Sequence, residues 1–425
     1  MIFESLIAMR RWLFLSLGLG ALISLATAGW ANQQIWAEQP EPVNAETPIE
    51  EQPRSPDRPM PLQPVAPSDA DAFLSTLLGL DDQLWDTSGR AGDRAALLTA
   101  IEYSLQYLQT SEATTAYAQY PIPAFTRDRV QRSLARFQQL LRSSRSAAEL
   151  QAAVLQEFEL YQSTGSDGSG TVGFTGYFEP VYLASRVPTA EYRYPLYRLP
   201  PTLEQWSTPH PTRLTLEGRD GLQAAQGQLR GLELVWLRDR LEAYLVQVQG
   251  SARLRLTDGT VMSVGYAGRT NYPYVSLGRE LVNDGKFREE DLSLPVVIDY
   301  FRQHPADLDQ YLPRNNRFVF FQETTGSPAI GSLGVPVTAE RSIATDKSLM
   351  PPGALALIQT QIPYPDTNGA LTSRFVSRYV LDQDTGGAIR GAGRVDIFMG
   401  TGEQAGDRAG LINTEGQLYY LLLKE

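Results

Sequence analysis

Beyond residue 163, glycine and proline divide the chain into short apolar runs, and this division limits the folds that it can adopt. Short apolar runs between turn-forming residues are typical of β-strands. A glycine- and serine-rich loop at 163–170 precedes the first run, and one short helix fits 295–303. We therefore expect a mostly β body, with strands near residues 172–178, 243–249, 254–256, 318–321 and 395–398.

The preceding region, 69–162, shows the different spacing of amphipathic helices. Apolar residues recur every three to four positions after Asp93, Thr126 and Ser146, and the last series extends to Tyr161. Thr126 and Ser146 are residue types that favour helix starts. We expect these apolar faces to form core rather than a ligand site. The whole pattern predicts an α+β protein in which a helical region precedes the β body.

The N-terminus has the features of an export signal. Arg10 and Arg11 precede an apolar run over 12–28 that ends in small residues. This run is 17 residues long, just enough for an uncleaved anchor. We expect a signal peptide or N-terminal anchor over 1–31, so that the rest of the chain lies outside the cytoplasm.

A proline-rich segment follows the apolar run. Nine prolines lie among the 28 residues from Pro40 to Pro67, mixed with polar residues. A segment of this composition favours a semi-extended tether over a packed core. The sequence therefore predicts a linker over 32–68.

Composition excludes several classes of function. The formal net charge of −11 argues against a nucleic-acid partner, which requires a basic surface. With no cysteine, the chain has no disulfide, no thiol nucleophile and no lipid attached through an N-terminal cysteine. The only histidines, His210 and His304, lie in no recognisable motif, and we expect both to be ordinary surface residues. We expect neither a metal nor a cofactor.

Near the C-terminus, one carboxylate has a sequence context suited to acid catalysis. Alternation along a strand places Val395 and Ile397 on one face and Asp396 on the other. Aliphatic neighbours at a strand end would partly desolvate this carboxyl group, raise its pKa and keep a proton on it. The residues alone leave open that Asp396 instead caps a turn, or pairs with Arg390 or Arg394.

Other aspartates lie in glycine-punctuated blocks that suit structural roles. Gly386 and Gly387 allow a tight turn at positive φ, where backbone amides can approach a ligand. Asp384 precedes this turn and is suited to accept its amides, which favours a structural role over a catalytic one. Asp346 could be held by its own loop or pair with Lys347.

Two further charged residues adjoin such blocks. Glu179 precedes Pro180, so its backbone is extended, and it could be an acid or a solvated residue at a strand end. Arg341 could bind a carboxylate of a ligand or bridge Asp346.

Taken in order, these blocks resemble those of the membrane-bound lytic murein transglycosylase A (MltA) family over about residues 172–423. The C-terminal blocks resemble a domain named for three aspartates, which fall on Asp346, Asp384 and Asp396, and the family's catalytic position falls on Asp396. The blocks are TGYFEP at 175–180, VQGS at 248–251, GYAG at 265–268, RSIATD at 341–346, DTGG at 384–387 and RVD at 394–396.

The resemblance implies a double-psi β-barrel over 163–182 and 315–425, with a smaller β domain inserted over 183–314 and a substrate groove between them. Peptidoglycan glycan strands would be the substrate, cut with formation of 1,6-anhydromuramyl ends, and Arg341 could bind the muramyl lactyl group. Besides the catalytic Asp396, the implied substrate-binding residues are Thr175, Tyr177, Glu179, Gln249, Gly250, Ser251, Arg341, Asp346, Asp384, Gly386 and Gly387.

The chain departs from the family in one respect. Many members are lipoproteins anchored through an N-terminal cysteine, which this chain lacks. We expect a periplasmic protein, soluble or tethered through its apolar N-terminus, and possible membership of a cell-wall synthesis or turnover complex. Three alternatives remain: a module that binds polysaccharide without cutting it, a two-carboxylate glycoside hydrolase, and an envelope scaffold in which region 69–162 is the functional part.

Overall fold

The computed structural model describes residues 60–65, 79–86, 91–324 and 328–425. The signal or anchor expected over 1–31 lies outside these ranges, as does most of the linker expected over 32–68. Within the described ranges, no helix combines the length and the apolar character needed to cross a membrane.

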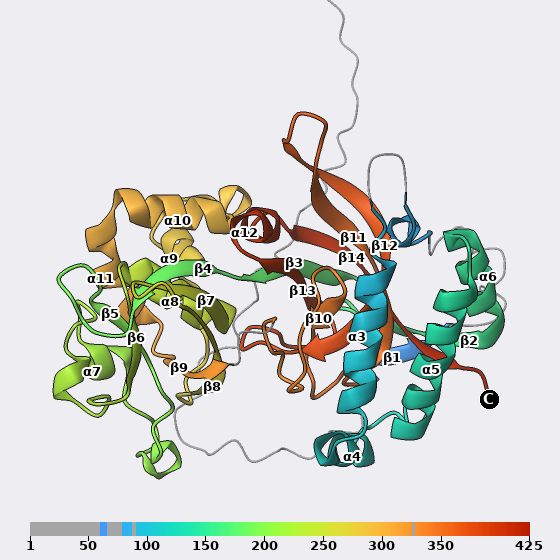
Figure 1. The fold of residues 1–425 in the computed structure, drawn as a ribbon, viewed down its shortest axis with the longest axis horizontal. Helices are drawn as coiled ribbons and strands as arrows, with labels where there is room; N and C mark the ends of the chain where they lie inside the picture. Colours follow the sequence, from blue (N-terminus) through green and yellow to red (C-terminus); the bar gives the residue numbers. More distant parts are fainter. Residues whose placement is uncertain (1–59, 66–78, 87–90, 325–327) are drawn as a thin grey trace, which may run out of the picture. The chain divides into compact units, whose positions relative to one another are not determined.

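Six strands close into a barrel (Figure 1). Their order is β14-β11-β12-β10-β13-β3, and β14 also pairs with β3, which completes the ring. The pairs β13–β3 and β10–β12 are parallel, whereas the other pairs are antiparallel. This arrangement confirms the predicted barrel. The strands are β3 (Val172–Glu179), β10 (Ser342–Ala344), β11 (Leu355–Pro365), β12 (Leu371–Asp384), β13 (Arg394–Thr401) and β14 (Asn413–Leu423).

The predicted helical region packs against the barrel, with α3 against β12 and α5 against β14 (Figure 1). The predicted helix starts are confirmed at Thr126 and Ser146, whose side chains accept the backbone N–H groups of Arg129 and Glu149. These bonds satisfy amides that a helix end leaves free. The helices are α3 (Arg94–Tyr107), α4 (Ser111–Ala118), α5 (Arg127–Ser143) and α6 (Ala147–Glu157).

Two predictions at the edges of this region were wrong. The helix that starts after Ser146 ends at Glu157, and the next residues form β2 (Phe158–Ser163), which pairs with β14. The end of the expected linker forms β1 (Leu62–Pro64) and pairs with β2, with Leu62 buried. Both short segments gain ladder hydrogen bonds from an existing sheet, and a proline is tolerated at such an edge.

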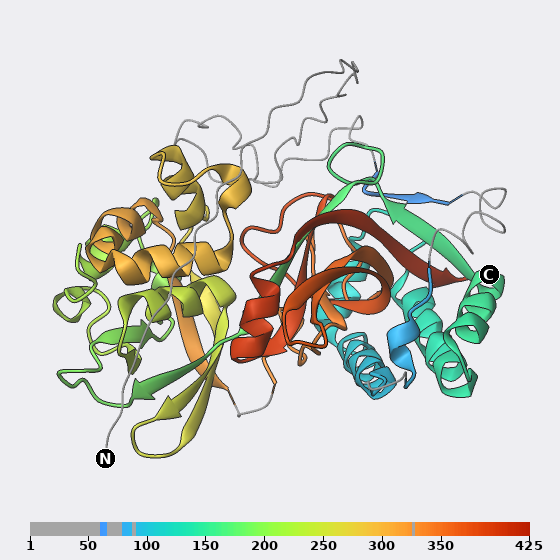
Figure 2. The same ribbon diagram turned by 90° about the horizontal axis from the view of Figure 1, so that it is seen from above.

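The segment between β3 and β10 forms a second sheet with its own core. Its strand order is β5-β6-β4-β7-β8-β9. Helix α8 lies between this sheet and helices α9, α10 and α11 (Figures 1 and 2), and its apolar side chains pack on both. The strands are β4 (Val181–Ser185), β5 (Tyr194–Tyr197), β6 (Glu233–Leu237), β7 (Ser251–Leu256), β8 (Val261–Arg269) and β9 (Val319–Thr324).

One strand prediction in this insert was wrong and the helix prediction was confirmed. Residues 243–249, expected as a strand, belong to helix α8, which Asp239 caps by accepting two backbone N–H groups. A short apolar run does not by itself distinguish a strand from a buried helix. The predicted helix over 295–303 is α10. The helices are α7 (Arg213–Glu217), α8 (Arg240–Gln249), α9 (Leu277–Asn283), α10 (Leu294–Gln303) and α11 (Leu308–Tyr311), and α12 (Glu403–Ala409) follows β13.

Candidate functional site

Strand register brings distant polar residues into one row across the barrel. Asp384 on β12 is opposite Ala344 on β10, and Ala344 is opposite Asp396 on β13. Asp396 is in turn opposite Thr175 on β3. Neighbouring strands are about 4.8 Å apart. The backbones of Asp384 and Asp396 lie two strands apart, so they are separated by roughly two such spacings.

Asp396 is a largely buried carboxylate without a good partner. Val395 and Ile397 point into the core, as the alternation predicts, and the Asp396 side chain keeps 21% of its exposure. Its Oδ1 is out of contact with solvent and accepts no hydrogen bond from the described residues. Burial raises the pKa of Asp396, and the charge of Asp384 raises it further, whereas Arg394 acts in the opposite direction. This environment favours the protonated acid.

Arg394 is turned partly away from Asp396. Its Nη2 lies 3.7 Å from Oδ1 of Asp396 and donates a 3.1 Å hydrogen bond to Oγ1 of Thr175. The expected alternative, a pair between Asp396 and Arg394, is therefore present only as a long contact. A hydrogen bond from nitrogen to oxygen is usually below about 3.2 Å.

Asp384 is held by three donors. Its Oδ1 accepts the backbone N–H groups of Ser332 and Thr385, both at 2.8 Å, and its Oδ2 accepts the Tyr177 hydroxyl at 2.7 Å. Burial raises the pKa of Asp384, and these bonds work against that effect. The ring of Tyr177 packs on Phe398 with 5.2 Å between centroids. Asp384 therefore accepts a turn amide, as expected, and also fixes Tyr177 beside the row.

Asp346 is held by its own loop, one of the two alternatives from the sequence. Oδ1 accepts the backbone N–H and the hydroxyl of Ser348, and Oδ2 accepts the Gly391 N–H at 2.9 Å. Lys347 pairs with the buried Asp382 instead. The side chain of Asp346 is buried, and these donors occupy both of its carboxylate oxygens, which indicates a structural role.

The structure contradicts the expectation that Arg341 binds a ligand or bridges Asp346. Arg341 is completely buried, and its guanidinium pairs with Asp81 and Asp93 and donates to the carbonyl of Tyr379. Nothing at the surface can reach it. Its partners lie in the segment before α3, so the residue joins that segment to the barrel.

Glu179 is also placed differently from the expectation of an acid or a solvated residue. Its side chain is 1% exposed and pairs with Arg253 at 3.2 Å. The Thr401 hydroxyl donates to Oε2 at 2.7 Å. Glu179 therefore joins the end of β3 to β7 and β13. Its carboxylate is a buried structural group that a substrate cannot reach.

The block at 249–251 connects the insert to β3. Oε1 of Gln249 accepts the backbone N–H of Phe178 at 3.0 Å. Gly250 ends α8 in the left-handed conformation, φ 78°, and the buried Ser251 starts β7. Glycine is the usual residue at such a helix end. These contacts fix the helix end against the barrel strand that carries Thr175.

The glycine turn after Asp384 differs from the prediction. Neither Gly386 nor Gly387 has a positive φ. Instead, a Cβ built on Gly387 would overlap Nη1 of Arg317, so this glycine makes room for a guanidinium group. Sequence reasoning missed Arg317, although it lies in the block NNRFVFF at 315–321 that precedes the RSIATD block.

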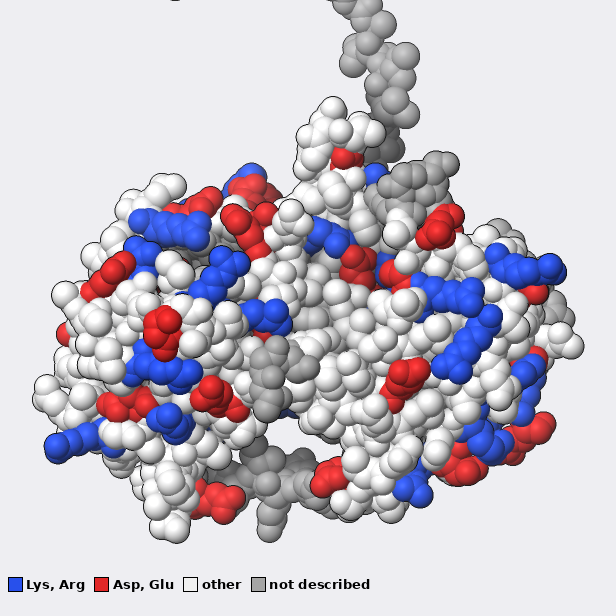
Figure 3. Space-filling view, in the orientation of Figure 1, with Lys and Arg blue, Asp and Glu red and all other residues white. Residues whose placement is uncertain are grey.

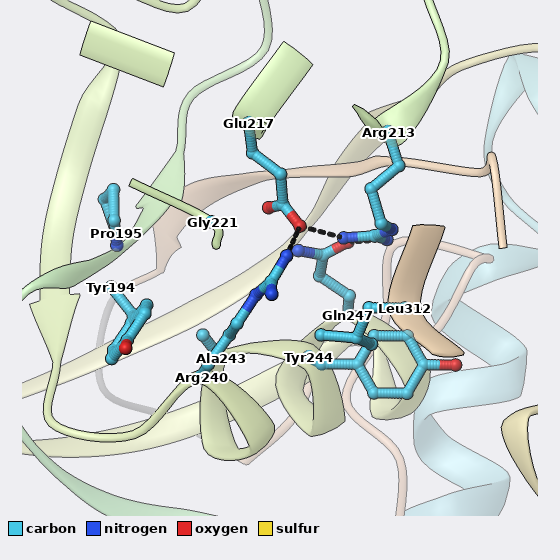
Figure 4. A pocket seen from close by; sticks show the side chains of 10 residues that line it. All are labelled: Tyr194, Pro195, Arg213, Glu217, Gly221, Arg240, Ala243, Tyr244, Gln247 and Leu312. Atoms are coloured by element: carbon cyan, nitrogen blue, oxygen red, sulfur yellow. Dashed lines mark hydrogen bonds and ion pairs between the residues drawn. The ribbon is translucent and has the colours of Figure 1, made fainter. Parts of the chain in front are cut away.

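A polar cluster inside the insert is filled by its own ion pairs. Arg213 and Arg240 both bond to Glu217, and Arg213 also donates to Gln247 (Figure 4). The remaining cavity is about 10 Å³, space for at most one water molecule. It cannot hold a sugar. In the part of the chain that the structure describes, no cluster of three or more His, Asp or Glu side chains could hold a metal ion.

Comparisons with known proteins agree with this geometry. The family model of the MltA specific insert domain matches residues 173–322, and that of the 3D domain matches residues 341–422. Membrane-bound lytic murein transglycosylase A of Escherichia coli K12 is 32% identical over 265 residues, 62% of this chain and 69% of the relative. The Vibrio cholerae protein of the same name is 32% identical over 277 residues, 64% of this chain and 72% of the relative.

Solved structures give the same result. A membrane-bound lytic murein transglycosylase from Agrobacterium tumefaciens matches with TM-score 0.62 and 25% identity over 78% of this chain and 93% of that one. E. coli MltA with bound chitohexaose matches with TM-score 0.61 and 26% identity over 80% and 92% of the two chains. The chain therefore belongs to the membrane-bound lytic murein transglycosylase A family.

Proposed function

We propose that the chain cleaves peptidoglycan glycan strands between N-acetylmuramic acid and N-acetylglucosamine, leaving 1,6-anhydromuramyl ends. The observation that carries this proposal is the state of Asp396, largely buried in the row of polar residues, whose Oδ1 accepts no hydrogen bond from the described residues. The names of the relatives and the chitohexaose bound to E. coli MltA support a glycan substrate.

Asp396 would act first as acid and then as base. Burial raises its pKa, which favours the protonated acid, and this acid would give its proton to the glycosidic oxygen as the C1–O bond breaks. The resulting carboxylate then takes the proton of the muramyl C6 hydroxyl, whose oxygen attacks C1 of the same sugar. Because the nucleophile is already part of the substrate, the reaction consumes no water.

The remaining aspartates suit support rather than a second catalytic role. An ordinary glycosidase needs a second carboxylate as base or nucleophile. Asp346 and Asp384 have their oxygens occupied by backbone and side-chain donors. We propose that Asp384 positions Tyr177, and that Thr175 and Tyr177 face the substrate. These contacts favour a single-carboxylate lyase over a two-carboxylate hydrolase.

A digest of isolated sacculi tests the proposal. Wild-type protein should release soluble muropeptides one water lighter than hydrolysis products, as measured by mass spectrometry. Asp396→Asn should release none while keeping its circular dichroism spectrum. Products with reducing ends would identify a hydrolase instead. Strands that are bound but not cut would identify a non-catalytic wall-binding module.

We also propose that the protein works outside the cytoplasm, in the periplasm of a Gram-negative-type envelope. The apolar run over 12–28 supports an export signal, and the relatives are named membrane-bound. Residues 1–31 would be the signal or anchor and the following proline-rich stretch a tether up to β1. Fractionation of cells expressing the full chain, with and without residues 1–31, tests this placement.

A further inference from the structure

Arg317 extends from the insert to the barrel. Its side chain is buried, and Nε donates to the carbonyl of Tyr272 at 2.9 Å. Its Nη1 occupies the space next to Gly387 where any other residue would have a Cβ. Toward the described residues, the two terminal nitrogens make neither a hydrogen bond nor an ion pair. A buried guanidinium in this state has donors available for a ligand.

Two more arginines approach the same place. Burial first, and then the charges of Arg269 and Arg390, lower the pKa of Arg317 to about 10, so Arg317 remains a cation at neutral pH. Arg269 donates one hydrogen bond, to the carbonyl of Thr270, and Arg390 is exposed. None of the three pairs with a carboxylate in the described ranges. Elsewhere, on the face drawn in Figure 3, basic and acidic side chains are interspersed.

The cluster adjoins the row that contains Asp396. Nη1 of Arg317 lies beside Gly387, in the loop that joins Asp384 at the end of β12 to Arg394 at the start of β13. Burial raises the pKa of Tyr274, and the charges of Arg317 and Arg394 both oppose this rise. Arg394 in turn lies 3.7 Å from Asp396. An anion held by Arg317 would therefore lie near the reacting carboxylate.

There is room for a substituent beside Arg269. Arg269 and the half-exposed Tyr266 line a hollow of about 620 Å³, together with Leu199, Leu203 and one acid, Glu204. A volume of roughly 300–1,000 Å³ is typical of sites for small organic groups. The hollow combines apolar walls with a cation at one side.

We propose that Arg269, Arg317 and Arg390 bind a carboxylate of the substituent on N-acetylmuramic acid. This inference rests on the proposed function and deepens it. Muramic acid differs from glucosamine by a lactyl ether on O3, whose carboxylate is free in peptide-free strands. In peptide-bearing strands it is an amide, and the peptide supplies other carboxylates. Guanidinium groups bind carboxylates through paired, charge-assisted hydrogen bonds.

Binding to the full chain carrying Asp396→Asn, measured by calorimetry, tests the inference without turnover. The probes are peptide-free glycan strands, the same strands with methyl-esterified carboxylates, soluble peptide-bearing strands and chitohexaose. The first variant is Arg317→Gln. Because Arg317 is buried and its substitution could harm folding, Arg269→Gln and Arg390→Gln are tested separately. The control is Arg145→Gln, which removes a charge from a side chain that is 90% exposed.

Each site variant should bind carboxylate-bearing strands roughly tenfold more weakly, the size of one charge-assisted bond, and bind chitohexaose as before. Esterification should weaken wild-type binding equally and leave the variants unchanged. Weaker binding of peptide-free strands by the variants would identify the lactyl carboxylate as the ligand. Weaker binding of peptide-bearing strands alone would identify a carboxylate of the peptide. Equal loss on chitohexaose, or no loss on any strand, would overturn the inference. An active Asp396→Asn enzyme would refute the proposed function separately, because binding is measured independently of cleavage.

Discussion

Buried charges occur in two regions of the barrel, and they differ in whether they are paired. Where the segment before α3 joins the barrel, Arg341 and Arg378 form ion pairs with Asp81, Asp93 and Glu340. In the row of polar residues, Oδ1 of Asp396 accepts no hydrogen bond from the described residues and has only a 3.7 Å contact with Arg394. The pKa values diverge accordingly: Arg378 and Arg408 overcome burial and lower that of Glu340 to about 2, whereas burial raises that of Asp396. A close ion pair stabilises the charged form and suits a structural role, whereas burial without a close donor favours the protonated form that we propose for catalysis by Asp396.

Removal of the Asp396 carboxylate should have the largest effect. Asp396→Asn should lower the rate of muropeptide release by at least about 10³-fold, within the range for general acid–base groups, since one residue performs both steps. The same change should raise the free energy of unfolding by about 0.5–2 kcal/mol, as often occurs when a destabilised active-site group is removed. The sign follows from the raised pKa, since burial opposes the charged form at neutral pH. Near-normal release would refute the assignment.

The paired region should respond in the opposite way. Arg341→Met leaves Asp81 without its ion-pair partner, whereas Asp93 keeps Arg378, and breaking a buried pair costs about 3–5 kcal/mol. Urea unfolding should show this loss. The control, Arg145→Gln, removes an exposed charge and should change stability by less than about 0.5 kcal/mol. A small effect of Arg341→Met would mean that this network does not hold the segment before α3 to the barrel.

Sequence patterns predicted those parts of the molecule that depend on neighbours in the chain. Thr126 and Ser146 were predictable as helix starts because a cap acts over three residues. The two faces around Asp396 followed from strand alternation. Residues 243–249 were misassigned because a buried apolar run fits both a helix and a strand.

Partners brought in from distant segments could not be predicted. Arg341 meets Asp81, 260 residues away, and no spacing rule reports such a pair. The sequence marks Gly387 as a turn glycine. Its role is to make room for the side chain of Arg317, which comes from the other side of the domain junction. The resemblance to a family supplied the row of aspartates. It also pointed to Asp396 as the catalytic position, but it did not show that donors occupy both carboxylate oxygens of Asp346 and Asp384.

The paired region should also set the acid limit of stability. Glu340 has its pKa lowered from 4.5 to about 2 in the folded chain. A carboxyl group with a depressed folded pKa adds stability above its unfolded value, and this contribution is lost as the pH falls toward the folded value. Thermal unfolding should therefore show a decline between about pH 4.5 and 2 that Glu340→Gln reduces. An unchanged slope in the variant would assign the decline to other groups.

The smallest effect should come from Tyr177→Phe, which tests how the two carboxylates of the row are coupled. The change removes one of three donors to Asp384 and keeps the ring that packs on Phe398. Because the Tyr177 hydroxyl lowers the pKa of Asp384, its loss should raise that pKa and leave less negative charge near Asp396. The pKa of Asp396 should then fall, so the alkaline limb of the rate profile should move to lower pH. We expect a rate loss of roughly three- to tenfold, the usual size for one hydrogen bond of this kind. A pH profile that keeps its position while the rate falls would show that the Tyr177 hydroxyl does not influence Asp396 through Asp384.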